Sequence, residues 1–360
     1  MMRSAVAVLF LASVVGAGVV DTRQGDAPDR VASTATTTST TTTTAAPETT
    51  TTAAPTTAPA SSTTAAASTL LPATPATPPS TAVAPVPVAA GDVKVLVTPS
   101  GVVVPVTGRE ATGYRVTTPC GRSAVVAKGT PVIDADVVLD AGHGGAEPGA
   151  ISPTGLSEKG INLGVVNAAR AALEKEGVRT VRTRTGDYRV TIATRTQIAK
   201  ALKPKAFVAV HHNAEPDGPR DGPGSETYYQ IGSPDSKRLA GLIYEEVVKA
   251  LSAYEIAWVA DTDAGAKYRA NVNGGDYYGI LRNAQGVTSA LAEMAFVSNP
   301  AEADLLSRPD VQQVEGEALA RAILRYLRTG EPGSGFTEPY PRSSPAGGGG
   351  GSSHCADPAL

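Results

Sequence analysis

Between Asp136 and Thr329, apolar residues recur along the chain in two alternating patterns. Short runs of consecutive apolar residues predict buried strands, and stretches with apolar residues three or four positions apart predict amphipathic helices. In the first such stretch Ile161, Val165 and Ala172 share a face, and Gly177 marks its end. The predicted strands are 136–140, 178–182, 206–211, 226–230 and 288–293, and the predicted helices are 158–175, 192–202, 236–251 and 311–327.

This series of strands and helices predicts a domain of the α/β class over residues 135–329. Its sheet is expected to be mostly parallel and twisted, with helices on both faces in a phosphorylase/hydrolase-like arrangement. In open sheets of this kind the active site lies beyond the carboxyl ends of the strands. His143 follows the first predicted strand, His211 ends the third and Glu293 ends the last. We therefore expect these three side chains to lie near one another.

A different pattern precedes this domain. Residues 92–134 contain short Val-rich alternating runs between Gly and Pro turns, which predict a small β-meander. Two interpretations stay open: a wall-binding or SH3-like module, or an all-β appendage packed on the next domain. The second is favoured because few aromatic side chains are available for stacking on a ligand.

The two ends of the chain lack either pattern. Residues 31–91 consist mainly of Thr, Ala, Pro and Ser, and Glu48 is their only ionisable residue, so residues 21–91 are predicted to be a disordered linker or stalk. Residues 330–360 are rich in Gly, Pro and Ser and are predicted to be a disordered tail. In such a tail His354 and Cys355 are expected to be incidental.

The first 20 residues are predicted to direct export. A short start with Arg3 precedes an uncharged apolar run over residues 4–20, whose length lies between that of a signal-peptide core and that of a membrane-spanning helix. Residues 1–20 are therefore either a signal peptide or an N-terminal anchor. In both cases we expect the protein to act outside the cytoplasmic membrane, in the cell wall or a periplasm-like space. In the second case residues 4–20 would tether it to the membrane.

Charge and cysteine content exclude several classes of function. The 360 residues carry a formal net charge of −3, which argues against a dedicated nucleic-acid binder because such proteins need a basic face. The two cysteines, Cys120 and Cys355, are too few for a disulfide framework or a Cys-rich zinc site.

Two histidines and one glutamate supply the donor set of a metal site. His143, His211 and Glu158, which opens a helix, offer two imidazoles and one carboxylate, the set of a catalytic zinc that keeps one position open for water. Their spacing fits no short zinc motif. His211 and His212 point to opposite faces of a strand, and His211 is the expected ligand because it is the first polar residue after a buried run. His212 is left to orient a ligand, to contact substrate or to lie at the surface.

Glu293 stands inside an apolar run, between Ala292 and Met294. A carboxylate in such surroundings costs several kcal/mol if it is unpaired. One interpretation is an ion pair with Arg195 or Arg282. The other is a general base that acts beside a metal site.

Four blocks of this sequence, in order, resemble the zinc-dependent N-acetylmuramoyl-L-alanine amidases of the AmiC-like class, amidase type 3. The first two are Leu139 to Gly145 with Glu158 to Leu163, which resemble the opening of the family, and Thr183 to Asp187 leading to Arg195. The others are Phe207 to Ala214, similar to the block with the second histidine ligand, and Leu291 to Pro300, similar to the block with the catalytic glutamate. The resemblance covers about residues 136–327, and the β-rich segment lies outside it.

The resemblance implies a zinc ion held by His143, Glu158 and His211, with Glu293 as general base. It implies a hydrolase that cleaves the amide bond between the lactyl group of N-acetylmuramic acid and L-Ala of the stem peptide. The partners would be the glycan strands and stem peptides of peptidoglycan, in cell-wall remodelling or daughter-cell separation. The family usually has a small residue after the second histidine, where this chain has His212.

Several alternatives stay open. The Gly-, Asp- and Tyr-rich insertion over residues 253–279 is either a border of the substrate groove, a regulatory lid or a packed surface loop. An activator of the enzyme cannot be identified from sequence. The rival functions are another zinc peptidase that acts on stem peptides and a catalytically inactive wall-binding protein.

Overall fold

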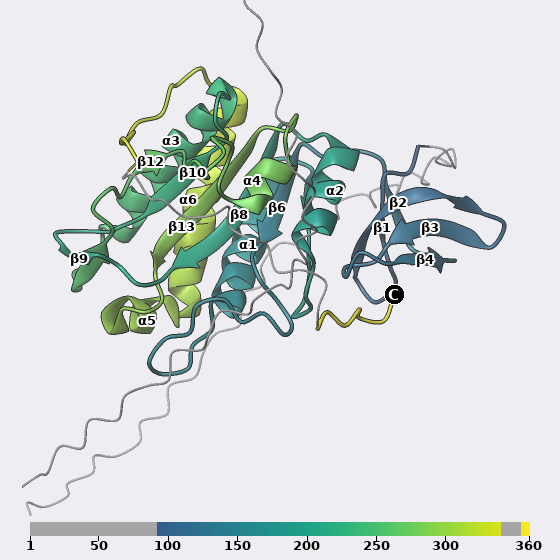
Figure 1. The fold of residues 1–360 in the computed structure, drawn as a ribbon, viewed down its shortest axis with the longest axis horizontal. Coiled ribbons are helices and arrows are strands. Elements are labelled where there is room, and N and C mark those ends of the chain that lie inside the picture. Colours follow the sequence, from purple (N-terminus) through teal and green to yellow (C-terminus); the bar gives the residue numbers. More distant parts are fainter. Residues whose placement is uncertain (1–91, 340–353) are drawn as a thin grey trace, which may run out of the picture. The chain divides into compact units, whose positions relative to one another are not determined.

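The computed structural model describes residues 92–339 and 354–360 (Figure 1). The predicted export segment, the predicted linker and residues 340–353 of the predicted tail lie outside these residues. Within the described part of the chain, no helix is both long and apolar enough to cross a membrane.

The strands are β1 (Val95–Val97), β2 (Val103–Glu110), β3 (Gly113–Thr117), β4 (Ser123–Val126), β5 (Thr130–Val132), β6 (Val137–Ala141), β7 (Thr180–Arg182), β8 (Ala206–Asn213), β9 (Gly218–Arg220), β10 (Glu226–Tyr229), β11 (Trp258–Ala260), β12 (Ala266–Lys267) and β13 (Ser289–Phe296). The helices are α1 (Glu158–Lys175), α2 (Ile192–Leu202), α3 (Pro234–Leu251), α4 (Gly279–Asn283), α5 (Pro300–Leu306) and α6 (Pro309–Arg328).

Residues 92–134, which we call the β-module, form an antiparallel sheet with the strand order β4-β3-β2-β1-β5. Side chains alternate between the two faces of a sheet, and in the β-module both faces contain buried residues. One face holds the module's own small core around Leu96 and Val104. On the other face Val95 and Val103 join Ile198 of α2 in a shared apolar cluster. The module therefore packs on the following domain, as the second sequence interpretation expects.

The α/β domain contains a six-stranded sheet with the order β12-β10-β13-β8-β6-β7. Strands β7, β6, β8 and β13 run parallel, which confirms the prediction of a mostly parallel sheet. β10 runs antiparallel to β13, and β12 follows the direction of β10. The reversal has a simple cause: no helix lies between β8 and β10, and a parallel connection normally needs a crossover helix.

Helices cover both faces of this sheet (Figure 1). On one face α1, α3 and α6 pack against alternate residues of the central strands, such as Leu139 and Val208. On the other face α2 and α4 pack against the residues in between, such as Val138 and Phe207. The strands are thus apolar on both sides, which explains why they appear in the sequence as continuous hydrophobic runs.

The prediction of a disordered tail is wrong for the described residues after α6. Residues 331–339 run along the edge of the sheet, where Ala266 donates to the carbonyl of Gly335 (2.8 Å) and Thr337 donates to the carbonyl of Ala266 (3.1 Å). Residues 354–360 lie against the β-module, to which Cys355 is joined by a disulfide with Cys120.

Asp357 strengthens this attachment. Its carboxylate accepts hydrogen bonds from the backbone N–H of Cys120 (2.7 Å), the hydroxyl of Thr118 (2.9 Å) and the guanidinium of Arg122 (2.9 Å). Composition could not indicate these contacts, because the two cysteines are 235 residues apart and the intervening tail reads as a flexible segment.

The disulfide yields a stability prediction. Cys355→Ser should lower the free energy of unfolding by about 2 to 4 kcal/mol, because the cross-link restricts the unfolded chain. Chemical denaturation under non-reducing conditions measures this change. Reductant should destabilise the wild-type protein and leave the Cys120→Ser/Cys355→Ser double variant unaffected. Equal stability of the wild-type protein with and without reductant would contradict the prediction.

Candidate metal centre and active site

Strand register brings His211 and Glu293 side by side. In the ladder between β8 and β13, Leu291 pairs with Ala209 and Glu293 pairs with His211. Ala209 and Leu291 face α2 and α4, so His211 and Glu293, two residues later, point to the same side. His212 points to the opposite face, where it is buried between α1 and α6.

His143 lies in a turn after β6 whose backbone is held from outside. Its φ of 59° is in the left-handed region, which costs a non-glycine residue about 1 to 2 kcal/mol. Arg195 donates to the carbonyl oxygens of His143 (2.6 Å) and Ala141 (2.6 Å). Arg184 donates to the carbonyl oxygens of Ala141 (2.8 Å) and Gly142 (2.8 Å). These charge-assisted bonds offset the strain and fix the direction of the His143 side chain.

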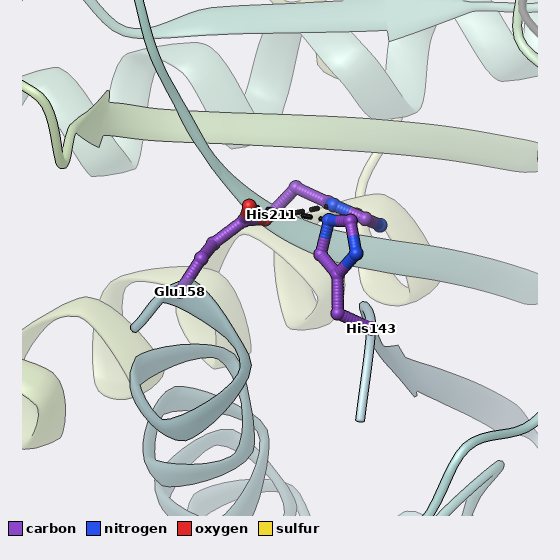
Figure 2. Close-up of side chains that lie close together, drawn as sticks. All are labelled: His143, Glu158 and His211. Carbon is purple, nitrogen blue, oxygen red and sulfur yellow. Dashed lines mark hydrogen bonds and ion pairs between the residues drawn. The ribbon is translucent and has the colours of Figure 1, made fainter. Parts of the chain in front are cut away.

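Figure 2 shows the side chains of His143, Glu158 and His211 pointing toward one another. His143 Nε2 lies 3.1 Å from Glu158 Oε2, and His211 Nδ1 lies 2.9 Å from Glu158 Oε1. One ligand atom from each residue lies within 4.8 Å of the others. The close approach requires two glycines: a Cβ on Gly142 would lie 2.3 Å from the His211 ring, and one on Gly149 would lie 2.3 Å from Glu158 Oε2.

The electrostatics of these three residues fit a divalent cation. Burial disfavours the charged form of Glu158, but hydrogen bonds with His143 and His211 outweigh it and hold its pKa well below the usual range. Burial is the main cause that lowers the pKa of His211. An ionised carboxylate and a neutral imidazole are the forms that bind metal. The three residues predicted as ligands therefore fit zinc, and their role as ligands stays a prediction.

Glu293 lines a pocket of about 320 Å³ together with His143 and His211. Apolar side chains such as Ile280 and the ring of Tyr278 complete its wall. Both imidazoles of the candidate metal centre and the Glu293 carboxylate thus face one space. Tyr278 lies in the predicted insertion, so that part of the insertion borders the pocket.

The structure pairs Arg195 with a different acid from the one considered in the sequence. Arg195 Nη1 lies 2.6 Å from Asp140 Oδ1, and both side chains are buried. Arg282, the other cation considered for Glu293, donates to two backbone carbonyl groups. The ion pair of Glu293 with Arg195 is therefore not the arrangement in the fold.

A second carboxylate influences Glu293. Glu226 lies directly opposite it in the ladder between β10 and β13. Burial, and then the nearby carboxylates of Glu158 and Glu226, raise the pKa of Glu293 well above the usual range for glutamate. A raised pKa makes a carboxylate a stronger proton acceptor once it is ionised.

Glu226 also belongs to a group of acids on the far side of Glu293. Glu226, Asp261 and Asp263 lie close enough together to hold a cation. The buried ammonium of Lys267 contacts Glu226 and lies 2.6 Å from Asp263 Oδ1. Positive charge is therefore already supplied to this group by a side chain, and we assign no metal to it.

Several residues of the site were not identified from the sequence as functional. Asp140 and Arg184 hold the His143 turn, and Asn162 donates to Glu158 Oε1 (3.0 Å). Asp140 gave a signal that could have been used, because an acid within a buried strand needs a partner. Lys267 gave none, since its short strand β12 is found only by tertiary pairing.

Comparisons with known proteins bear on this site. The family model described as N-acetylmuramoyl-L-alanine amidase matches residues 137–325. The chain is 32% identical over 210 residues to the uncharacterized protein YqiI of Bacillus subtilis, a match that covers 58% of this chain and 90% of that protein. It is 26% identical over 224 residues to N-acetylmuramoyl-L-alanine amidase AmiC of Neisseria meningitidis, covering 54% of this chain and about half (53%) of that relative. Of the solved structures, N-acetylmuramoyl-L-alanine amidase AmiC2 of Nostoc punctiforme has 29% identity and a TM-score of 0.45, covering 53% of this chain and 96% of that one.

The matched region coincides with the α/β domain and contains His143, Glu158, His211 and Glu293. It spans more than half of the 360 residues. The prediction of an N-acetylmuramoyl-L-alanine amidase is thereby confirmed at the level of family and enzyme class. This chain belongs to the N-acetylmuramoyl-L-alanine amidase family.

Proposed function

We propose that the protein is a zinc-dependent hydrolase of peptidoglycan that cleaves the amide bond between the lactyl group of N-acetylmuramic acid and L-Ala of the stem peptide. The observation that carries the proposal is the convergence of His143, Glu158 and His211, two of which, His143 and His211, line one pocket with Glu293. Two imidazoles and one carboxylate are the donor set of catalytic zinc sites that keep a position open. The intact set also disfavours a catalytically inactive wall-binding protein.

In the proposed mechanism His143, Glu158 and His211 hold the zinc ion. When bound there, zinc supplies a Lewis acid that polarises the amide carbonyl and makes water a stronger nucleophile. Glu293 faces the same pocket. Its carboxylate takes the proton of the attacking water and returns it to the leaving amine of L-Ala, first as general base and then as general acid.

The low-dielectric wall around Glu293 suits this role. Burial and the neighbouring carboxylates raise its pKa, and a nearby cation would lower that pKa again by favouring the ionised form. These opposing influences act on a carboxylate that, in the proposed mechanism, accepts a proton and then releases it. Arg195 and Arg184 keep the His143 turn in place.

We also propose that the protein works outside the cytoplasmic membrane, in the cell wall or a periplasm-like space, during wall remodelling or daughter-cell separation. The predicted export segment over residues 1–20 supports this location. The disulfide between Cys120 and Cys355 supports it independently, since disulfides persist in oxidising compartments.

Product analysis tests the bond that is cleaved. Digestion of purified peptidoglycan should release intact stem peptides that begin with L-Ala, together with peptide-free glycan, as identified by mass spectrometry. The same digestion after treatment with a chelator should release none. Trimmed stem peptides that remain attached to the glycan would identify the rival zinc peptidase instead.

Glu293→Ala should keep zinc and lose cleavage by about 10²- to 10⁴-fold, because the proton acceptor is removed while the ligands remain. Metal analysis of the purified variant and the rate of muropeptide cleavage measure the two effects. Glu174→Gln, on an exposed face of α1, is the matched control and should change neither. Release of stem peptide at the wild-type rate by Glu293→Ala would show that the assignment of the base is wrong.

His143→Ala should lose both zinc and activity, since it removes one of three donors. His354→Ala, which changes an exposed histidine outside the set, should lose neither. After chelation, added zinc should restore the wild-type protein and the control but not His143→Ala. Stoichiometric zinc in purified His143→Ala would contradict the proposed ligand set.

A further inference from the structure

A chain of buried polar groups extends from Glu158 into the interior of the domain. Asn162 Nδ2 donates to Glu158 Oε1 (3.0 Å), and Asn162 Oδ1 lies 2.8 Å from His212 Nδ1. His212 Nε2 in turn lies 3.3 Å from Glu315 Oε1. The three residues behind Glu158 come from α1, β8 and α6, and each is at most 2% exposed. We call Asn162, His212 and Glu315 the buried relay.

The direction of the hydrogen bonds in the buried relay is set by Glu158 and by the carbonyl of Gly142, to which Asn162 Nδ2 also donates (3.3 Å). An ionised carboxylate only accepts, so Asn162 must turn its NH₂ group toward Glu158 and its oxygen toward His212. The amide oxygen only accepts as well, so His212 Nδ1 carries a hydrogen. One further proton then lies between His212 Nε2 and Glu315 Oε1, whichever of the two atoms holds it. Every link therefore depends on the one before it.

Packing alone does not explain these residue types. Glu315 is fully buried on α6, and within the described residues its Oε2 has no hydrogen-bond partner. A buried ionic pair usually stabilises a fold no better than apolar side chains of the same volume. The contact between α1 and α6 is already tight, since a Cβ on Gly316 would lie 2.4 Å from Ala168 Cβ. A polar chain at this position indicates a role in orientation rather than in stability.

His212 holds Glu158 by two routes. Its backbone N–H donates to Glu158 Oε1 (3.1 Å), while its side chain fixes Asn162, which donates to the same oxygen. On the other side, the backbone N–H of Ala150 donates to Glu158 Oε2 (2.8 Å). The carboxylate is thus restrained in the plane that faces His143 and His211. The side-chain route through His212 is the one a substitution can remove without changing the backbone.

We propose that His212 and Glu315 are positioning residues that act through Asn162 to hold the Glu158 carboxylate in the orientation required by the metal centre. This inference rests on the proposed zinc site. It assigns a role to His212, for which the sequence leaves several roles open. Outer hydrogen-bond partners of metal ligands typically contribute 10- to 100-fold to metal affinity.

The test compares zinc affinities of the full chain, measured by competition with a chromophoric chelator. His212→Phe keeps an aromatic ring and removes both nitrogens, and it should weaken zinc binding about 10- to 100-fold. Glu315→Gln should bind zinc within about 3-fold of the wild-type protein, because its NH₂ group can donate to Nε2 and preserve the direction of every other bond. Ser225→Ala, a buried polar residue outside the relay, is the control for a general loss of stability.

The outcomes separate the inference from the proposed function. If the wild-type protein binds no zinc, the proposed function fails before any variant is compared. If it binds zinc and His212→Phe binds it equally tightly, the inference is overturned and the proposed function stands.

If His212→Phe fails to fold, Glu315→Leu replaces it in the test. Glu315→Leu is expected to bind zinc more weakly than Glu315→Gln. The thermal midpoint of the metal-free protein is measured for both variants. The positioning role is supported if His212→Phe lowers this midpoint no more than Ser225→Ala does and only His212→Phe reduces zinc affinity.

Discussion

The candidate active site depends on two buried guanidinium groups that hold one short stretch of backbone. Arg184 and Arg195 together donate hydrogen bonds to the carbonyl oxygens of residues 141–143. Without these bonds the left-handed backbone of His143 would be free to relax. Burial, and then the charge of Arg195, lower the pKa of Arg184 to about 10, which still leaves it cationic at neutral pH. Asp140 balances part of this charge through its pair with Arg195.

The sheet supplies the remaining geometry through its register. Because residues paired across neighbouring strands point to the same face of a sheet, His211 and Glu293 meet without any loop having to position them. The antiparallel strand β10 adds Glu226 at the same level. One face of three strands thus presents a proposed ligand, a proposed base and an acid that raises the base's pKa. The opposite face of β8 presents His212 to α1 and α6.

Much of this arrangement could be predicted from the sequence, for physical reasons. Buried strands of a parallel sheet appear as uninterrupted apolar runs, so the polar residues that follow them, such as His143 and His211, are conspicuous. The direction of β10 could not be predicted, because it depends on a connection that lacks a helix. The pairing of Arg195 with Asp140 and the buried relay were also inaccessible. Such contacts depend on which of several polar side chains meet across elements distant in sequence, and a single chain carries no record of that choice.

The disulfide has a topological consequence. The covalent path from Cys120 through the whole α/β domain to Cys355 and back across the sulfur atoms is a closed ring. The ring includes every strand of the six-stranded sheet and the helices that cover both of its faces. A single peptide-bond cut anywhere within it converts the ring into one branched molecule rather than two fragments. For a hydrolase proposed to act outside the cell membrane, where proteases attack exposed segments, a nicked ring would keep its proposed ligands, base and relay on one covalent piece.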